Sequence, residues 1–293
     1  MPGATGRTGA PAAETAGQTP APPAGSAVVV GGGTMGAGIA QSLIQAGVNV
    51  LLCEVTEEAA IAARRRVEEA LIRAEDHAAL ARLEIADRLA GLDDASLAIE
   101  AVPEDPGLKQ EVLVRLEELL PERALLATNT SSLSVSDMAA ALRRPERFLG
   151  MHFFNPVPRS ALVEVVTTPV TADETVTTAR SWVRALDKQE IVTRDSPGFA
   201  TSRLGLVIGL EAIRMLEEGV ASAEDIDKGM VLGYRFPIGP LHLSDLVGLD
   251  VRLAIAEHLA ARLGERFEPP RLLRDKVAAG ELGKKTGRGF FDW

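Results

Sequence analysis

Cysteine, aromatic residues and long apolar runs are all scarce in this chain of 293 residues, in which the only cysteine is Cys53. A single cysteine excludes an intrachain disulfide, which fits a reducing compartment, so we expect a cytoplasmic protein. The apolar runs are too short to span a bilayer, and we predict no membrane segment. A formal net charge of -10 leaves no basic footprint for nucleic acid. We also predict no bound metal.

Residues 1–25 consist largely of Gly, Ala, Pro and Thr, with almost no large apolar side chain. Such a segment cannot bury enough surface to offset the entropy that ordering would cost, so we predict a disordered tail. It also lacks the basic start and the apolar core of a signal peptide.

Strand-like and helical segments alternate from residue 26 to residue 197. Short apolar runs such as AVVV (27–30), VNVLLCEV (48–55) and SLAIE (96–100) predict buried strands. Residues 56–92 are rich in Ala, Glu and Arg, and we expect them to be helical throughout. Strands that alternate with helices predict an α/β fold with a doubly wound, mainly parallel sheet of the Rossmann type.

The remaining residues, 198–293, have the pattern of helices joined by turns that contain glycine and proline, which predicts an all-α C-terminal domain. Residues 204–219 are apolar almost all round. A helix of that kind is buried on most sides, either inside the helical domain or against a second subunit. We therefore expect this domain to form a homodimer.

A glycine-rich turn, GGGTMG (31–36), follows the first strand and opens a helix within a strand–helix–strand unit. In that context the G-x-G-x-x-G spacing is specific for dinucleotide binding. Gly31 allows the tight turn, Gly33 lets a pyrophosphate approach the backbone, and Gly36 lets helix and strand pack closely. The free N–H groups of the helix N-terminus would face the diphosphate.

Glu54 ends the second strand of this unit, 18 residues after Gly36. A carboxylate at this position accepts hydrogen bonds from the adenosine ribose hydroxyls, and it repels a 2′-phosphate. Val55 and Thr56 offer no cation, and Arg64 lies too far along the helix. We therefore predict NAD rather than NADP as the cofactor.

His152 and Glu164 stand on two strand-like runs, RFLGMHFF and ALVEVV, that are separated by the turn sequence NPVPRS. If the strands fold back around Pro158, the two residues stand opposite each other with their side chains on one face. The carboxylate would then hold one ring nitrogen and leave the other free to move protons. A histidine that fills a gap in the core is the alternative. No such partner is evident for the other histidines, His77, His242 and His258.

Seven segments occur in the order that the L-3-hydroxyacyl-CoA dehydrogenase family shows, so the chain resembles that family over about residues 26 to 293. They are GGGTMGAGIA, AIEAVPED, TNTSSLS, HFFNPVPRSALVEVV, DSPGFATSRL, PIGPLHLSDLVGLDV and GKKTGRGFFDW. The resemblance is greatest to the short form without a fused hydratase, the 3-hydroxybutyryl-CoA dehydrogenases. It implies reversible NAD-linked oxidation of a short-chain L-3-hydroxyacyl-CoA to the 3-ketoacyl-CoA, by a dimer joined through its helical domain.

The resemblance also implies roles for individual residues. His152 would take the proton of the 3-hydroxyl as hydride leaves C3, and Glu164 would orient His152. Ser131 would hydrogen-bond the substrate oxygen or the thioester, and Asn155 would shape the nicotinamide side. The implied cofactor contacts are Gly31, Gly33, Thr34, Met35, Gly36, Glu54, Glu104, Lys109, Asn129 and Lys285. From the residues alone, solvated surface charges are the simpler interpretation of Lys109, Lys284 and Lys285.

Two segments depart from the family pattern. Where the family has Asn in PGF-x-x-N-R this chain has Ser202, a shorter side chain with one donor, and we expect activity with altered geometry. The helical segment after Glu54 lacks the family's hairpin that contacts CoA through a Ser and a Lys, and Ala70 and His77 stand near those positions. The lost charge has candidate replacements on this segment, although an Arg-rich helix is more often a solvated face: Arg64, Arg65, Arg66 and Arg73.

Two other functions stay open on the sequence. One is a dehydrogenase of a free hydroxy acid, similar to gulonate dehydrogenase and lambda-crystallin, although the aromatic HFFNPVP segment favours an acyl chain. The other is a non-catalytic protein that binds NAD or CoA, against which the set of His152, Glu164 and Ser131 argues. Acyl-chain length, pathway and physiological direction also stay open.

Overall fold

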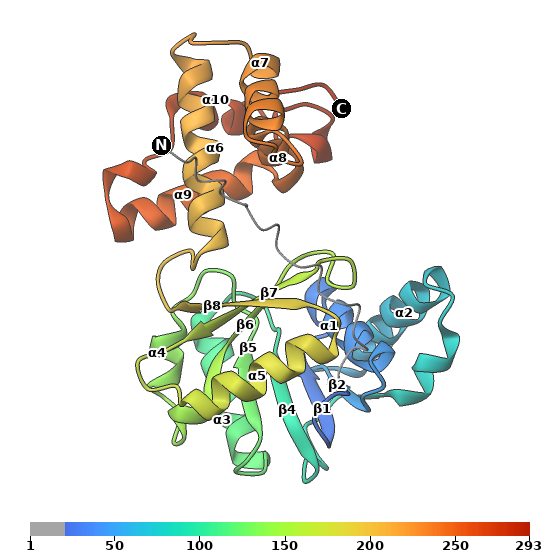
Figure 1. Ribbon diagram of the computed structural model, residues 1–293. Coiled ribbons are helices and arrows are strands. Elements are labelled where there is room, and N and C mark those ends of the chain that lie inside the picture. The colour runs from blue at the N-terminus through green and yellow to red at the C-terminus, as the bar shows by residue number, and fades with distance from the viewer. Residues whose placement is uncertain (1–20) are drawn as a thin grey trace, which may run out of the picture.

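The computed structural model describes residues 21–293. Residues 1–20, which make up most of the predicted disordered tail, lie outside the described residues. Figure 1 shows a sheet with helices on both sides and, after its last strand, a separate group of helices. This arrangement is the α/β fold with a following helical part that the sequence predicts.

The first strand–helix–strand unit forms as the sequence predicts. β1 (Ser26–Val30) runs into α1 (Thr34–Gln45), and β2 (Val50–Cys53) returns parallel to β1. β1 is an unbroken apolar run because both faces of the sheet are covered at this point. α1 is followed by Gly47, whose φ of 88° is the left-handed conformation that glycine allows.

Eight strands of the described residues form one sheet in the order β3-β2-β1-β4-β5-β6-β7-β8. The first six in chain order run parallel, and the last two run against them. The remaining strands are β3 (Leu83–Ala86), β4 (Ala95–Glu100), β5 (Leu125–Thr128), β6 (Phe148–Phe153), β7 (Leu162–Thr167) and β8 (Gln189–Arg194). The strand order reverses at β1, and ligands of such sheets bind beyond the carboxyl ends of the strands near that point.

β3 corrects the prediction that residues 56–92 are helical throughout. α2 (Glu57–Arg73) is followed by a 3-10 turn, η1 (His77–Arg82), and then by β3, which pairs in parallel with β2 at the sheet edge. Leu83 is buried in the core beneath α2, and Ile85 packs against it. Helix propensity is a weak prior, and the burial of these two side chains in the sheet outweighs it.

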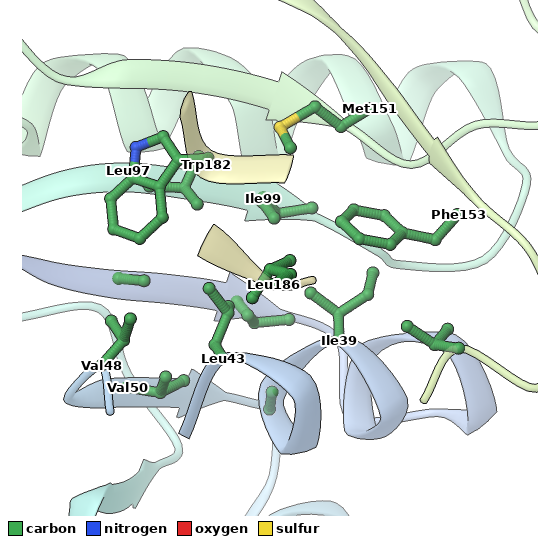
Figure 2. Close-up of a cluster of buried hydrophobic side chains, with 14 of the residues drawn as sticks. Ile39, Leu43, Val48, Val50, Leu97, Ile99, Met151, Phe153, Trp182 and Leu186 are labelled. Atoms are coloured by element: carbon green, nitrogen blue, oxygen red, sulfur yellow. The ribbon is translucent and has the colours of Figure 1, made fainter. Parts of the chain in front are cut away.

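Helices cover both faces of the sheet. α1, α2 and α5 (Asp173–Ala185) pack on one face, and α3 (Pro106–Leu119) and α4 (Val135–Ala139) pack on the other. Figure 2 shows Trp182 of α5 close to Leu97 of β4, with Leu43 of α1 on the same side of the sheet. Trp182 is fully buried, so this face carries a continuous core beneath the helices.

From Thr201 onward, the described chain forms helices and short helical turns, with two isolated β-bridges at Arg288 near the C-terminus. Their apolar sides make a core of their own, which includes Leu210, Leu241 and Leu259. No helix within residues 21–293 is long and apolar enough to cross a membrane. These elements are α6 (Thr201–Glu217), α7 (Ala223–Lys228), the π-helical turn η3 (Gly229–Gly233), α8 (Pro240–Val247), α9 (Leu249–Leu263), η4 (Glu265–Phe267), α10 (Arg271–Ala278) and η5 (Lys284–Thr286).

Asp245 of α8 fixes the C-terminal segment of the chain. Its carboxylate, which is almost fully buried, accepts hydrogen bonds from the backbone N–H groups of Phe290 (2.9 Å) and Phe291 (3.0 Å) and from the Trp293 indole (3.0 Å). A buried carboxylate is costly unless it is hydrogen-bonded, so these three bonds both satisfy Asp245 and anchor the chain end.

Candidate active site

The glycine-rich turn joins β1 to α1 at the carboxyl edge of the sheet. Gly31 has a φ of 99°, and a Cβ at this position would lie 2.6 Å from the Ala101 carbonyl oxygen. A Cβ at Gly36 would collide with the carbonyl oxygen of Gly31. At Gly33 a Cβ would meet nothing within 4 Å, and no side chain caps the start of α1. A tight turn, an open approach and an uncapped helix N-terminus together fit a bound pyrophosphate.

Glu54 lies beside this turn and holds it. Its Oε1 accepts a hydrogen bond of 2.6 Å from the N–H of Gly32, and the carbonyl of Gly32 accepts one of 3.2 Å from Arg66. The cation that reaches the turn is therefore Arg66 and not Arg64, which pairs with Glu68 along α2. Sequence spacing did not predict that Arg66 reaches the glycine turn. The position of a side chain around the helix axis, more than its distance along the axis, decides where it points.

Lys109 of α3 is buried, which corrects its interpretation as a plain surface charge. Its side chain is 1% exposed, and its ammonium lies 2.8 Å from Glu100, 3.2 Å from Glu104 and 3.1 Å from the Val102 carbonyl. An ammonium has three donors, and all three have partners here. Lys109 therefore positions Glu104, while a direct contact with a cofactor stays a prediction. The sequence analysis did not single out Glu100, which is fully buried.

Glu104 organises the loop that follows β5. Its Oε1 accepts hydrogen bonds from the Thr130 hydroxyl (2.6 Å) and from the backbone N–H groups of Ser131 (3.0 Å) and Ser132 (3.1 Å). Partial burial alone would raise the pKa of Glu104, but the Thr130 hydrogen bond and the charge of Lys109 hold that pKa below its ordinary value. An ionised Glu104 thus fixes the backbone on which Ser131 stands.

Asn129, at the end of β5, makes the adjoining contact to β6. Its Oδ1 accepts a hydrogen bond of 2.9 Å from the backbone N–H of Phe153. The side chain therefore ties the serine loop to the strand that carries His152. Whether it also contacts the cofactor stays a prediction.

The pairing of His152 with Glu164 is confirmed. β6 and β7 are antiparallel, and their register places His152 directly opposite Glu164. The ring Nδ1 lies 2.7 Å from the Glu164 carboxylate, and the two side chains are 8% and 0% exposed. A buried carboxylate that holds Nδ1 leaves Nε2 as the ring nitrogen available for proton transfer. This geometry would suit a general base with its orienting partner, and the catalytic roles of the two residues stay a prediction.

Glu164 also holds the start of α6. It accepts hydrogen bonds from the N–H groups of Ala200 (3.1 Å) and Thr201 (2.9 Å) and from the Thr201 hydroxyl (2.9 Å). Burial alone would raise the pKa of Glu164, but the hydrogen bonds from His152 and Thr201 outweigh burial and lower that pKa. This second role could not be predicted from the sequence, because only the fold brings residues 164 and 200 together.

Ser131 and Ser202 line one cavity between the sheet-containing part and α9. The cavity measures about 230 Å³ and also borders Gly198 at the start of the helical part. Phe199, the next residue, lies with its ring centroid 5.7 Å from that of His152. The structure thus brings Ser131 and Ser202 to one cavity, and Phe199 lies between the border of that cavity and the ring of His152. That these residues act together in catalysis stays a prediction.

Asn155 lies on the other side of the β6–β7 turn. With Thr34 of α1 and Arg66 and Arg73 of α2, it lines a second cavity of about 240 Å³. A residue that the sequence analysis missed, Lys188, supports this turn. Its ammonium is buried and donates to the carbonyls of Val157 (2.7 Å) and Ser160 (2.6 Å), and burial lowers its pKa.

Two residues of the helical part have partners that the sequence does not reveal. Lys285 pairs with Asp250 of α9 at 2.5 Å and 2.7 Å and is 45% exposed, while its contact with a cofactor stays a prediction. His242, which shows no partner in the sequence, has one in Asp227 at 2.7 Å. Asp227 lies on α7, and the turn η3 brings it back to the start of α8.

Comparison with known proteins shows which class of protein has this fold and this site. The family described as "3-hydroxyacyl-CoA dehydrogenase, NAD binding domain" matches residues 26–196, and its "C-terminal domain" matches residues 198–293. The site and the match define an NAD-dependent oxidoreductase. The chain belongs to the 3-hydroxyacyl-CoA dehydrogenase family.

Relatives at about 40% identity cover almost the whole chain. The 3-hydroxybutyryl-CoA dehydrogenase of Mycobacterium tuberculosis is 42% identical over 277 residues, 90% of this chain and 97% of that protein. The probable 3-hydroxybutyryl-CoA dehydrogenase of Bacillus subtilis is 40% identical over 91% of this chain and 96% of that protein. The crystal structure of (S)-3-hydroxybutyryl-CoA dehydrogenase PaaH1 from Ralstonia eutropha superposes with a TM-score of 0.86 at 38% identity and covers 92% of this chain and 99% of that one.

Proposed function

We propose that this chain catalyses the reversible NAD-linked oxidation of a short-chain L-3-hydroxyacyl-CoA, of the 3-hydroxybutyryl-CoA type, to the 3-ketoacyl-CoA. The observation that carries the proposal is the buried His152–Glu164 pair beside the cavity of Ser131 and Ser202. The names of the relatives at 40 to 42% identity support the choice of substrate.

His152 is the general base in this proposal. Glu164 holds Nδ1, so the free Nε2 takes the proton of the 3-hydroxyl group. Because the pKa of Glu164 is lowered, its carboxylate is ionised at neutral pH and stabilises the imidazolium that forms. Ser131 and Ser202 hold the substrate oxygens from the cavity wall. In the reverse direction the imidazolium returns the proton.

The turn from Gly31 to Gly36 is the proposed site of the NAD pyrophosphate, with the N–H groups of Thr34 and Met35 as donors. Glu54 stands where it can accept from the ribose hydroxyls. Bound NAD supplies the hydride acceptor. Asn155 stands close to Thr34 around the second cavity, which supports its predicted place on the nicotinamide side.

Arg66 and Arg73 are the candidates for holding the phosphates of CoA. Of the four arginines in question, these two line the cavity beside Thr34, whereas Arg64 and Arg65 pair with glutamates of their own helix. A guanidinium is well suited to phosphate, because its planar fork can donate two hydrogen bonds. The matched variants Arg73→Ala and Arg65→Ala test this, since only the first should raise the KM for acetoacetyl-CoA while the KM for NADH stays unchanged.

Loss of NADH absorbance with acetoacetyl-CoA, compared with free acetoacetate and a panel of sugar acids, tests the proposed reaction. We expect turnover of the CoA ester and little of the free acids. Turnover of a free acid alone would instead support the hydroxy-acid dehydrogenase alternative. Binding of NADH without any turnover would support a non-catalytic relative.

A homodimer is part of the proposal. A cavity of about 640 Å³ opens between α6, α7 and η3, and its walls are almost entirely apolar, with Val207, Met215 and Met230 among them. Leu204, Leu232 and Tyr234 are 62%, 70% and 75% exposed in the single chain. Apolar surface of this extent marks an interaction site. Sedimentation at micromolar concentration should give a dimer, and a monomer would contradict it.

A cytoplasmic location is also proposed. Cys53 is the only cysteine, it is 3% exposed, and burial raises its pKa to about 11, so its thiol is unreactive and forms no intrachain bridge. Cell fractionation tests the location, and recovery of the chain outside the cytoplasmic fraction would contradict it.

A further inference from the structure

The wall of the active-site cavity that faces the serines contains one imidazole. Val251, Ala254, Ile255 and His258 of α9 line this wall together with Leu259. The first four occur at positions i, i+3, i+4 and i+7, so they share one side of the helix. Their side chains make an apolar surface that suits an acyl chain and is interrupted only by the ring of His258.

His258 differs from the other histidines in what holds it. His152 and His242 are each held by a carboxylate at 2.7 Å, and His77 is exposed at the surface. His258 is half-buried, and no hydrogen bond, ion pair or ring contact joins it to another residue within 21–293. The ring nitrogens of His258 are not among the buried side-chain atoms that lack a partner within residues 21–293, so they are accessible. They can therefore bind a group that enters the cavity.

The other contents of the cavity indicate the chemistry of that partner. The lining residues carry no carboxylate and no basic group besides His258, and the facing wall has the hydroxyls of Ser131, Ser132 and Ser202. The Ser132 hydroxyl donates to Glu104 at 3.1 Å, and the Ser131 hydroxyl makes a longer contact of 3.4 Å with the same carboxylate. The imidazole of His258 and the Ser202 hydroxyl can both donate hydrogen bonds to one oxygen. The pocket therefore suits an acyl group with an oxygen atom within reach of His258.

We propose that His258 hydrogen-bonds a carbonyl or carboxylate oxygen of the bound acyl-CoA and is a specificity-determining residue of this enzyme. The proposal rests on the proposed function. The oxygen has two possible sources with the same chemistry, which are the thioester carbonyl of every substrate and a carboxylate at the far end of the acyl chain.

The test uses three 3-ketoacyl-CoA substrates and two variants. Acetoacetyl-CoA and 3-ketohexanoyl-CoA have hydrocarbon chain ends, and 3-ketoadipyl-CoA is the six-carbon analogue that ends in a carboxylate. His258→Leu keeps the volume of the side chain and removes its hydrogen bond, whereas His258→Gln restores a donor. Arg262→Gln is the control at an exposed position of the same helix. Thermal unfolding of each variant reports on folding.

We expect His258→Leu to raise KM about threefold to tenfold, the worth of one hydrogen bond, with kcat little changed and with recovery in His258→Gln. An equal loss on all three substrates assigns the bond to the thioester. A loss on 3-ketoadipyl-CoA alone assigns it to the chain end. Unchanged kinetics on every substrate would overturn the proposal, as would equal losses in both variants with lowered stability. Inactivity of the wild type on all three would contradict the proposed function instead.

Discussion

Two histidine–carboxylate pairs of the same length lie in different parts of this protein. His152 and Glu164 join two strands of the sheet, and His242 and Asp227 join α7 to α8, each with Nδ1 at 2.7 Å from a carboxylate oxygen. Each carboxylate also accepts two backbone N–H groups at a helix start, which are those of residues 200 and 201 for Glu164 and of residues 241 and 242 for Asp227. The length of the hydrogen bond therefore does not identify a catalytic pair.

The surroundings of the two rings do separate them. The His152 side chain is 8% exposed and lies beside Phe199, which follows Gly198 of the serine cavity. The His242 ring is 42% exposed and stacks on Phe291 with centroids 3.6 Å apart. The ring of His152 thus lies near the border of the serine cavity, whereas the ring of His242 packs on the C-terminal segment. What the second nitrogen can reach distinguishes a general base from a structural histidine.

The largest difference between the two pairs is expected when each histidine ring is removed. His152→Gln should lower kcat by about 10²- to 10⁴-fold, the usual worth of a general base, while NADH binding persists. His242→Gln should change kcat by no more than about twofold, because substitutions away from a functional site act mainly on stability. Steady-state kinetics with acetoacetyl-CoA and fluorescence titration of NADH measure both. Comparable losses in kcat would mean that the second pair also serves catalysis.

Replacing each of the two carboxylates by its amide should show that one pair acts mainly on activity and the other mainly on stability. Glu164→Gln should lower kcat about 10²-fold or more, because the imidazolium loses its counter-charge. Asp227→Asn should cost about 1–3 kcal/mol of unfolding free energy, since it disturbs a buried acceptor of three hydrogen bonds, and should leave kcat nearly unchanged. Denaturant unfolding together with kinetics distinguishes the two outcomes.

The stability of the protein in acid should depend on the His152–Glu164 pair. The pKa of Glu164 is lowered in the folded state, so the ionised carboxylate adds stability above its ordinary pKa, and this contribution disappears as the pH falls through the folded value. The difference in unfolding free energy between the wild type and Glu164→Gln should therefore be largest near neutral pH and shrink in acid. A difference that does not vary with pH would show that the carboxylate charge is not what Glu164 contributes.

The smallest effect is expected where the ring of His242 stacks on Phe291. Phe291→Leu removes the aromatic partner of His242 and should cost about 0.5–1.5 kcal/mol, a lowering of Tm by a few degrees at most. The kcat/KM should not change. A clear fall in kcat/KM of the folded variant would indicate that the C-terminal segment affects the active site.

Much of the active site could be predicted from the sequence because it depends on local patterns. The register that pairs His152 with Glu164 follows from two short strands and the turn sequence between them. The glycine turn follows from spacing and from its place between a strand and a helix. In both cases the residues that matter lie within one supersecondary unit.

The residues that escaped prediction are those whose partners come from elsewhere in the fold. Lys109 is buried only because Glu100, the last residue of β4, and Glu104, four residues later, converge on its ammonium. Asp227 and His242 meet only when α7 and α8 pack together. β3 forms because the edge of the sheet accepts it, although its residues occur within a sequence that favours helix.

The four hydrogen bonds of Glu164 connect two events that could otherwise be independent. Three of them come from Ala200 and Thr201, where the chain passes from the sheet into the helical part, and the fourth comes from the base. Any displacement of α6 from the sheet would have to break hydrogen bonds to the same carboxylate that holds His152. The position of the helical part and the orientation of one imidazole ring therefore depend on a single side chain.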